Sequence, residues 1–140
     1  MKSDRHIVVL LAAMLLCGLA FAPTAKSADW PTWRHDAART ATSPAGLPDT
    51  LHLQWKRNFD RPTPASPNDV RLAYDRSYAP VSAGGTVFVP SMVTDSVTAL
   101  DTTTGEVKWT FFADGPVRFA PVASNGKVYF VSDDGHLYCV

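Results

Sequence analysis

The 140-residue sequence has no excess of either charge, which bears on whether it could bind nucleic acid. Its 13 Lys and Arg residues balance its 13 Asp and Glu residues, so the formal net charge is zero. When residues 1–27 are set aside, with Lys2, Asp4, Arg5 and Lys26, the rest of the chain has an excess of two acidic residues. Nucleic-acid-binding domains need a basic surface to neutralise phosphates. The composition therefore argues against a nucleic-acid partner.

Glutamate and catalytic motifs are also scarce. Glu106 is the only glutamate among the 13 acidic residues, and aspartate favours turns and caps over helix interiors. Helix should therefore be rare. The sequence contains no G-x-S-x-G motif, no glycine-rich phosphate loop and no cysteine with a convincing histidine partner. No catalytic residue is predicted, and whether the chain is an enzyme stays open at this stage.

The longest apolar run lies near the N-terminus. Two basic residues precede an apolar stretch over residues 7–21, and small residues follow up to Ala28. This order is typical of a secretory signal peptide. The run is shorter than the roughly 20 residues that span a bilayer, which makes a retained transmembrane helix the less favoured alternative. We expect a signal peptide over residues 1–28 and export to the periplasm, the cell envelope or the extracellular space.

Cysteine occurs twice. Cys17 lies in the leader, so Cys139 remains alone once the leader is removed. A single thiol is unusual in an exported chain. The simplest explanation is that any partner of Cys139 lies beyond residue 140.

A repeat of 41 residues follows the leader. Residues 78–81 return as 119–122, and residues 85–89 return as 126–130. A period near 41 with several short strands per copy is typical of a propeller blade. The first copy has four runs rich in Val, Thr, Phe and Tyr between turn residues, at 77–83, 86–91, 96–100 and 106–112. The sequence predicts an all-β fold of blades with four antiparallel strands.

A motif spans the third and fourth runs of the first copy. Its spacing is A-x-D-x-x-T-G-x-x-x-W, formed by Ala99, Asp101, Thr104, Gly105 and Trp109. Asp101 can accept backbone N–H bonds across the turn, and Gly105 can adopt a positive φ. Trp109 offers a large apolar ring with one donor. These properties suit a structural turn.

The motif resembles the repeat of the pyrroloquinoline-quinone (PQQ) type β-propellers, in which the tryptophan of each blade docks onto its neighbour. Residues 29–40 are similar to the segment that precedes the first blade in secreted PQQ-like repeat proteins. The resemblance implies a lead-in segment over residues 29–50 and PQQ-like repeats over residues 51–140. A closed ring of four to eight blades needs roughly 160 to 330 residues. We therefore expect an incomplete ring, the N-terminal fragment of a longer protein.

Residues 51–59 alternate apolar and polar side chains. Leu51, Leu53 and Trp55 fall on one face of an extended chain. The pattern predicts an outer strand without its first three strands, with Trp55 placed like Trp109.

A proline-rich insertion over residues 60–76 joins this outer strand to the next inner strand. Such a connection should project onto the propeller face where ligands commonly bind, because loops carry many binding sites. The candidate contacts are Arg71, Tyr74, Asp75, Arg76 and, in the next blade, Arg118. The favoured alternative is a solvated loop whose charges serve solubility.

His35, Asp36 and Arg39 could form a metal or acid–base cluster. A zinc site needs three or four ligands, and the other histidines after the leader, His52 and His136, lie in segments without a ligand pattern. We therefore predict no metal site and a structural role for Asp36 and Arg39. Trp30 and Trp33 could stack on a sugar or a quinone, although packing is favoured because of the area that a tryptophan buries.

The resemblance leaves three functions open. PQQ-dependent dehydrogenases rely on a vicinal cysteine pair, a catalytic acid and a calcium site, and none of these can be placed in this sequence. The favoured prediction is a secreted, non-catalytic scaffold or binding module of the cell envelope, with a protein partner or small ligand on the propeller face. The alternatives are the N-terminal part of a PQQ-dependent alcohol or sugar dehydrogenase, with PQQ and calcium as its cofactors, and a carbohydrate-binding propeller.

Overall fold

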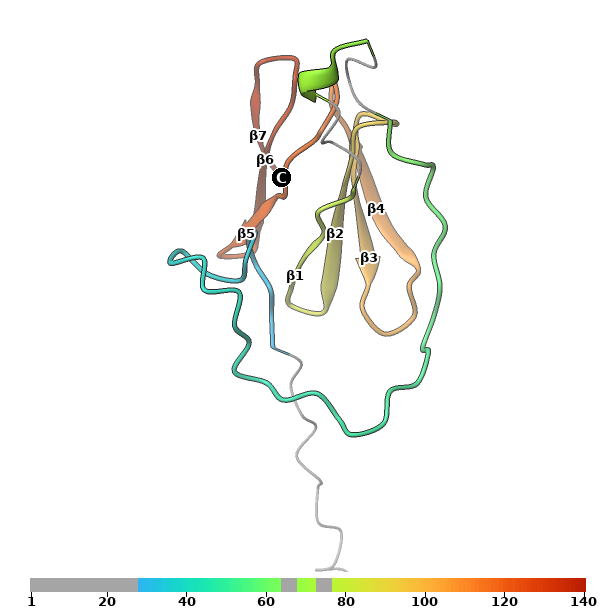
Figure 1. Ribbon diagram of the computed structural model, residues 1–140, viewed down its shortest axis with the longest axis vertical. Coiled ribbons are helices and arrows are strands. Elements are labelled where there is room, and N and C mark those ends of the chain that lie inside the picture. Colours follow the sequence, from blue (N-terminus) through green and yellow to red (C-terminus); the bar gives the residue numbers. More distant parts are fainter. Residues whose placement is uncertain (1–27, 64–67, 73–76) are drawn as a thin grey trace, which may run out of the picture.

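The computed structural model describes residues 28–63, 68–72 and 77–140, and these residues form two antiparallel sheets (Figure 1). The first sheet has the order β1 (Val81–Ala83), β2 (Thr86–Ser91), β3 (Ser96–Asp101) and β4 (Val107–Phe112). The second has the order β5 (Val122–Ser124), β6 (Lys127–Val131) and β7 (Leu137–Cys139). The 3-10 helix η2 (Val70–Leu72) lies in the insertion. The all-β prediction is confirmed, with one four-stranded blade and three strands of a second.

Strand boundaries follow the turn residues. The turns Gly84–Gly85 and Asn125–Gly126 join the first two strands of each blade, and both residues of each turn have positive φ. Two consecutive positive φ values are typical of the primed turns that match the twist of a hairpin. The sequence predicted that the first strand begins at residue 77, but β1 begins at Val81. The residue before it is Pro80, which has no N–H to donate to a neighbouring strand.

The core lies between the two blades. Its buried side chains come from both sheets and from the β4–β5 connection: Val81, Phe88, Val97, Ala99, Val117, Ala123, Val128 and Phe130. Phe111 of β4 packs on this cluster, with its ring centroid 5.7 Å from that of Phe130. Each sheet therefore buries one face against the other blade.

The lead-in segment holds both blades at their inner edges. The backbone of Trp30 exchanges two hydrogen bonds of 2.8 Å with Ser82 of β1. The carbonyl of Pro31 accepts a hydrogen bond of 2.8 Å from the N–H of Ala123 in β5. Ser82 and Ala123 are equivalent positions of the 41-residue repeat. Consecutive carbonyls of one segment thus bind the same position of two successive blades.

The prediction of an outer strand at residues 51–59 is wrong for this structure, which has no strand there. Leu51 is 70% exposed and Leu53 is 84% exposed, so the alternating face is not buried. A strand is defined by its backbone partners, and the described residues offer none beside this segment. Among the described residues, no helix has the length and apolar character that crossing a membrane requires.

Candidate functional site

The repeat motif forms a tight turn between β3 and β4. Asp101 Oδ1 accepts hydrogen bonds from the backbone N–H groups of Thr103 (2.8 Å) and Thr104 (3.1 Å), and Lys108 Nζ lies 3.1 Å from Asp101 Oδ2. The Thr103 N–H, followed by Lys108, holds the pKa of Asp101 below its ordinary value. The polar groups of the motif are therefore used to close the turn.

Trp55 lies on this turn. Its Nε1–H donates a hydrogen bond of 2.9 Å to the carbonyl of Thr102. Gly105 has a φ of 71°, and a Cβ at this position would be 2.6 Å from Cδ2 of Trp55. Glycine is therefore required here for its conformation and for the close approach of the ring. Trp109 contacts Phe88 within its own blade, with 5.8 Å between ring centroids.

The residues predicted to contact a ligand on the propeller face have different surroundings. Arg118 Nε donates to both carboxylate oxygens of Asp133, at 3.0 and 2.8 Å, and so joins the β4–β5 connection to the β6–β7 hairpin. The Arg71 side chain is 93% exposed, and its Nε lies 3.5 Å from Asp69 Oδ1. The other three candidates, Tyr74, Asp75 and Arg76, lie outside the described residues.

Asp134 is a second junction between the blades, which no motif in the sequence indicates. Its Oδ2 accepts hydrogen bonds from Tyr138 Oη (2.7 Å) and from the backbone N–H of Asp114 (3.1 Å). Its Oδ1 accepts one from the backbone N–H of His136 (2.8 Å). Desolvation opposes ionisation, but these hydrogen bonds, led by that of Tyr138, outweigh it and lower the pKa of Asp134 to about 2.

Gly115 allows this junction to close. A Cβ at Gly115 would lie 2.9 Å from the backbone nitrogen of Asp134. Beside it, the buried Ser132 Oγ–H donates a hydrogen bond of 2.8 Å to the carbonyl of Gly115. Local sequence could not reveal this contact, because Gly115 lies in the β4–β5 connection and Asp134 in the turn between β6 and β7.

The Asp134 junction predicts a specific pH dependence. The folded-state pKa of about 2 lies below the ordinary value of 3.8, so ionised Asp134 stabilises the fold above about pH 4. This contribution is lost as the pH falls through 3.8 towards about 2. We expect Asp134→Asn to be less stable than the wild type at pH 6 and the difference to shrink between about pH 4 and pH 2. Urea unfolding of the wild type and the variant across this pH range measures the difference in their free energies of unfolding. A difference that does not change with pH would contradict the stabilising role of ionised Asp134.

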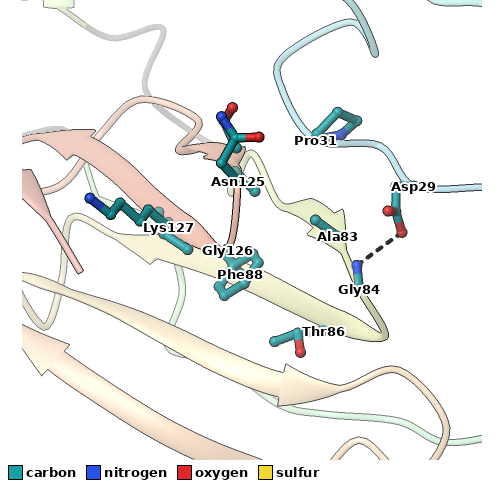
Figure 2. Close-up of a pocket in the computed structure, with 12 residues that line it drawn as sticks. Asp29, Pro31, Ala83, Gly84, Thr86, Phe88, Asn125, Gly126 and Lys127 are labelled. Atoms are coloured by element: carbon teal, nitrogen blue, oxygen red, sulfur yellow. Dashed lines mark hydrogen bonds between the residues drawn. The ribbon is translucent and has the colours of Figure 1, made fainter.

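A cleft of about 490 Å³ lies between the two blades at their first hairpin turns (Figure 2). Phe88, Ala123 and Val128 give it apolar walls, and Lys127 lies at one side. Asp29 lies at the other, where its Oδ1 accepts a hydrogen bond of 3.0 Å from the Gly84 N–H. The Asp29 carboxylate thus serves to attach the lead-in segment to the turn. The cleft has polar groups, Asp29, Thr86 and Lys127 among them, that could bind a small molecule.

The donor groups do not form a metal site in the described part of the chain. No three His, Cys, Asp or Glu side chains gather there closely enough to hold an ion. His35 Nδ1 lies 3.6 Å from Asp36 Oδ2, whereas the Arg39 guanidinium lies over the Trp33 ring. Among the described residues, no such group of side chains is therefore in place for the calcium that the resemblance implies.

Comparison with known proteins agrees with the architecture. No curated protein matches the sequence. A family model described as "Outer membrane protein assembly factor BamB" matches residues 32–140, more than three quarters of the chain. Together with the two antiparallel blades, this match shows that the chain belongs to this family of PQQ-like repeat proteins.

Proposed function

We propose that this chain is an exported, non-catalytic scaffold of the cell envelope that binds a protein partner during the assembly of outer membrane proteins. The observation that carries the proposal is the family match over residues 32–140. The proposal includes cleavage of residues 1–28, a lead-in segment over residues 29–50 and propeller repeats over residues 51–140.

The exposed side chains of η2 support a protein partner. Val70 and the side chain of Arg71 are 85% and 93% exposed on η2. This helix lies at the same end of the molecule as the β6–β7 hairpin (Figure 1). An exposed apolar side chain beside a cation suits a protein interface, where apolar contacts are buried and charges lie at the rim.

The β4–β5 connection and the β6–β7 hairpin, at the same end of the molecule, are held together by side-chain contacts. The ion pair of Arg118 with Asp133 fixes the β4–β5 connection against the β6–β7 hairpin, and the hydrogen bonds of Asp134 reinforce it. A preordered surface loses less conformational freedom on binding. These contacts favour an ordered surface at the end of the molecule where η2 lies (Figure 1).

The test uses the full chain with a photo-crosslinking residue at position 69, expressed in its own cells. We expect one outer membrane assembly protein to crosslink to the chain. Val70→Asp combined with Arg71→Glu should lower the yield of this crosslink about tenfold, since the two new carboxylates oppose burial of η2 in an interface. Leu47→Asp is the control, because Leu47 is 84% exposed and lies in the lead-in segment.

Two results would contradict the proposal. One is an equal loss of crosslinking in the control and in the double variant. The other is catalysis: if the chain with added PQQ and calcium reduced an artificial electron acceptor at the expense of an alcohol or sugar, the dehydrogenase alternative would replace the scaffold.

A further inference from the structure

The loop over residues 32–41 has a conformation fixed by its own backbone. The carbonyl of Arg34 accepts hydrogen bonds of 3.0 Å from the N–H groups of both Asp36 and Ala41, and the Arg39 N–H donates one of 2.9 Å to Asp36. Arg34, His35, Arg39 and Ala41 all have positive φ. Such values are costly for residues other than glycine and persist where the surroundings determine them. These backbone hydrogen bonds therefore give the loop a defined path.

Two arginines of this loop lie over one tryptophan. The guanidinium carbons of Arg34 and Arg39 are 5.5 and 5.4 Å from the ring centroid of Trp33. These distances are within the range of cation–π attraction. The Trp33 residue is nevertheless 52% exposed. Two cations and part of an aromatic ring are thus accessible at one place.

Asp36 has the carboxylate nearest in sequence to these arginines, and it binds Thr40 instead of them. Asp36 Oδ1 accepts a hydrogen bond of 3.0 Å from the Thr40 N–H, and Oδ2 accepts one from the Thr40 hydroxyl. The hydroxyl is the main cause that lowers the pKa of Asp36. Within the described ranges, neither Arg34 nor Arg39 has an ion-pair partner. Their N–H donors remain available to an anionic group.

We propose that Trp33, Arg34 and Arg39 form a binding site for an acidic protein segment. Carboxylates of the segment bind the two guanidiniums, for which their geometry is matched. An apolar side chain of the segment covers the exposed part of the indole. The site lies on the lead-in segment, not on η2, and does not depend on the proposed function.

Charge favours a peptide over a lipid surface. Recognition of anionic membranes generally uses clusters of four to eight basic residues. Residues 29–41 contain two arginines and two aspartates, so the segment has no net excess of formal charge with His35 neutral. Attraction at long range is therefore weak. A pair of guanidiniums beside an aromatic ring instead suits contact with individual carboxylates.

The test measures binding of fluorescein-labelled hexaglutamate to the full chain by fluorescence anisotropy. We expect saturable binding that weakens with added salt. Arg34→Gln combined with Arg39→Gln should weaken it about tenfold, as expected for the loss of two exposed ion pairs. Trp33→Leu should weaken binding of the same peptide with leucine at alternate positions. Lys56→Gln combined with Arg57→Gln removes the same charge from another exposed segment and should leave the affinity unchanged.

Three outcomes would overturn the inference: no saturable binding by the wild type, equal weakening in the two double variants, or tighter binding to phosphatidylglycerol vesicles than to the peptides. Circular dichroism of each variant checks that the fold is retained. Failure of peptide binding with continued crosslinking at η2 would overturn this site alone. Loss of crosslinking with intact peptide binding would instead affect only the proposed function.

Discussion

Gly105→Ala is expected to lower the free energy of unfolding by about 3 kcal/mol. Part of this loss comes from the φ of 71°, which is unfavourable for a residue with a Cβ. The rest comes from the overlap of that Cβ with Trp55, whose ring atoms would lie 2.6 to 2.9 Å away. Urea unfolding followed by tryptophan fluorescence measures the loss, and the emission of Trp55 should shift to longer wavelength as the ring leaves the turn.

Gly126→Ala is the matched control. Gly126 has a φ of 74°, but a Cβ there would meet no atom within 4 Å. Its substitution should cost only the conformational part, about 1 kcal/mol. If the two variants were equally unstable, the docking of Trp55 on Gly105 would not contribute to stability.

Phe130→Ala should destabilise the fold by about 4 kcal/mol, a value typical of a large aromatic side chain removed from a core. Phe130 is 3% exposed and lies between the two blades. Its ring stacks on Tyr138 with centroids 5.3 Å apart and packs on Phe111 at an interplanar angle of 66°. Removing it leaves a cavity where the sheets meet. The same urea titration gives the change in the free energy of unfolding.

Val131→Ala is the control for this prediction, because Val131 is the next residue of β6 and is 45% exposed on the other face. We expect its cost to be below about 1 kcal/mol. Similar costs for the two substitutions would mean that the packing between the blades does not determine stability.

The sequence was most informative where structure depends on neighbours in the chain. Strands β2 and β4 lie within one residue of their predicted ends, because glycine-rich turns and alternating side chains act locally. At residues 51–59 the same alternation was misleading, since a strand also needs a partner. Trp55 is held instead by the turn at Gly105.

The candidate site was less predictable, because its contacts join segments far apart in the sequence. Nothing near Asp134 indicates that its carboxylate accepts a hydrogen bond from the backbone of Asp114. Nor does the sequence reveal that Arg118 binds Asp133. The pair of arginines on Trp33 depends on the positive φ values of the loop, for which its sequence contains no glycine.

The attachment of the lead-in segment has a consequence for the order of folding. Trp30 and Pro31 precede both blades in the chain, yet their carbonyls bind Ser82 and Ala123. Contacts between such distant residues form late, because the entropy of closing long loops must first be offset by other contacts. Trp30 and Pro31 are therefore expected to reach their native positions only after the inner strands β1 and β5 have formed. Their docking would then mark the point at which both blades are in place.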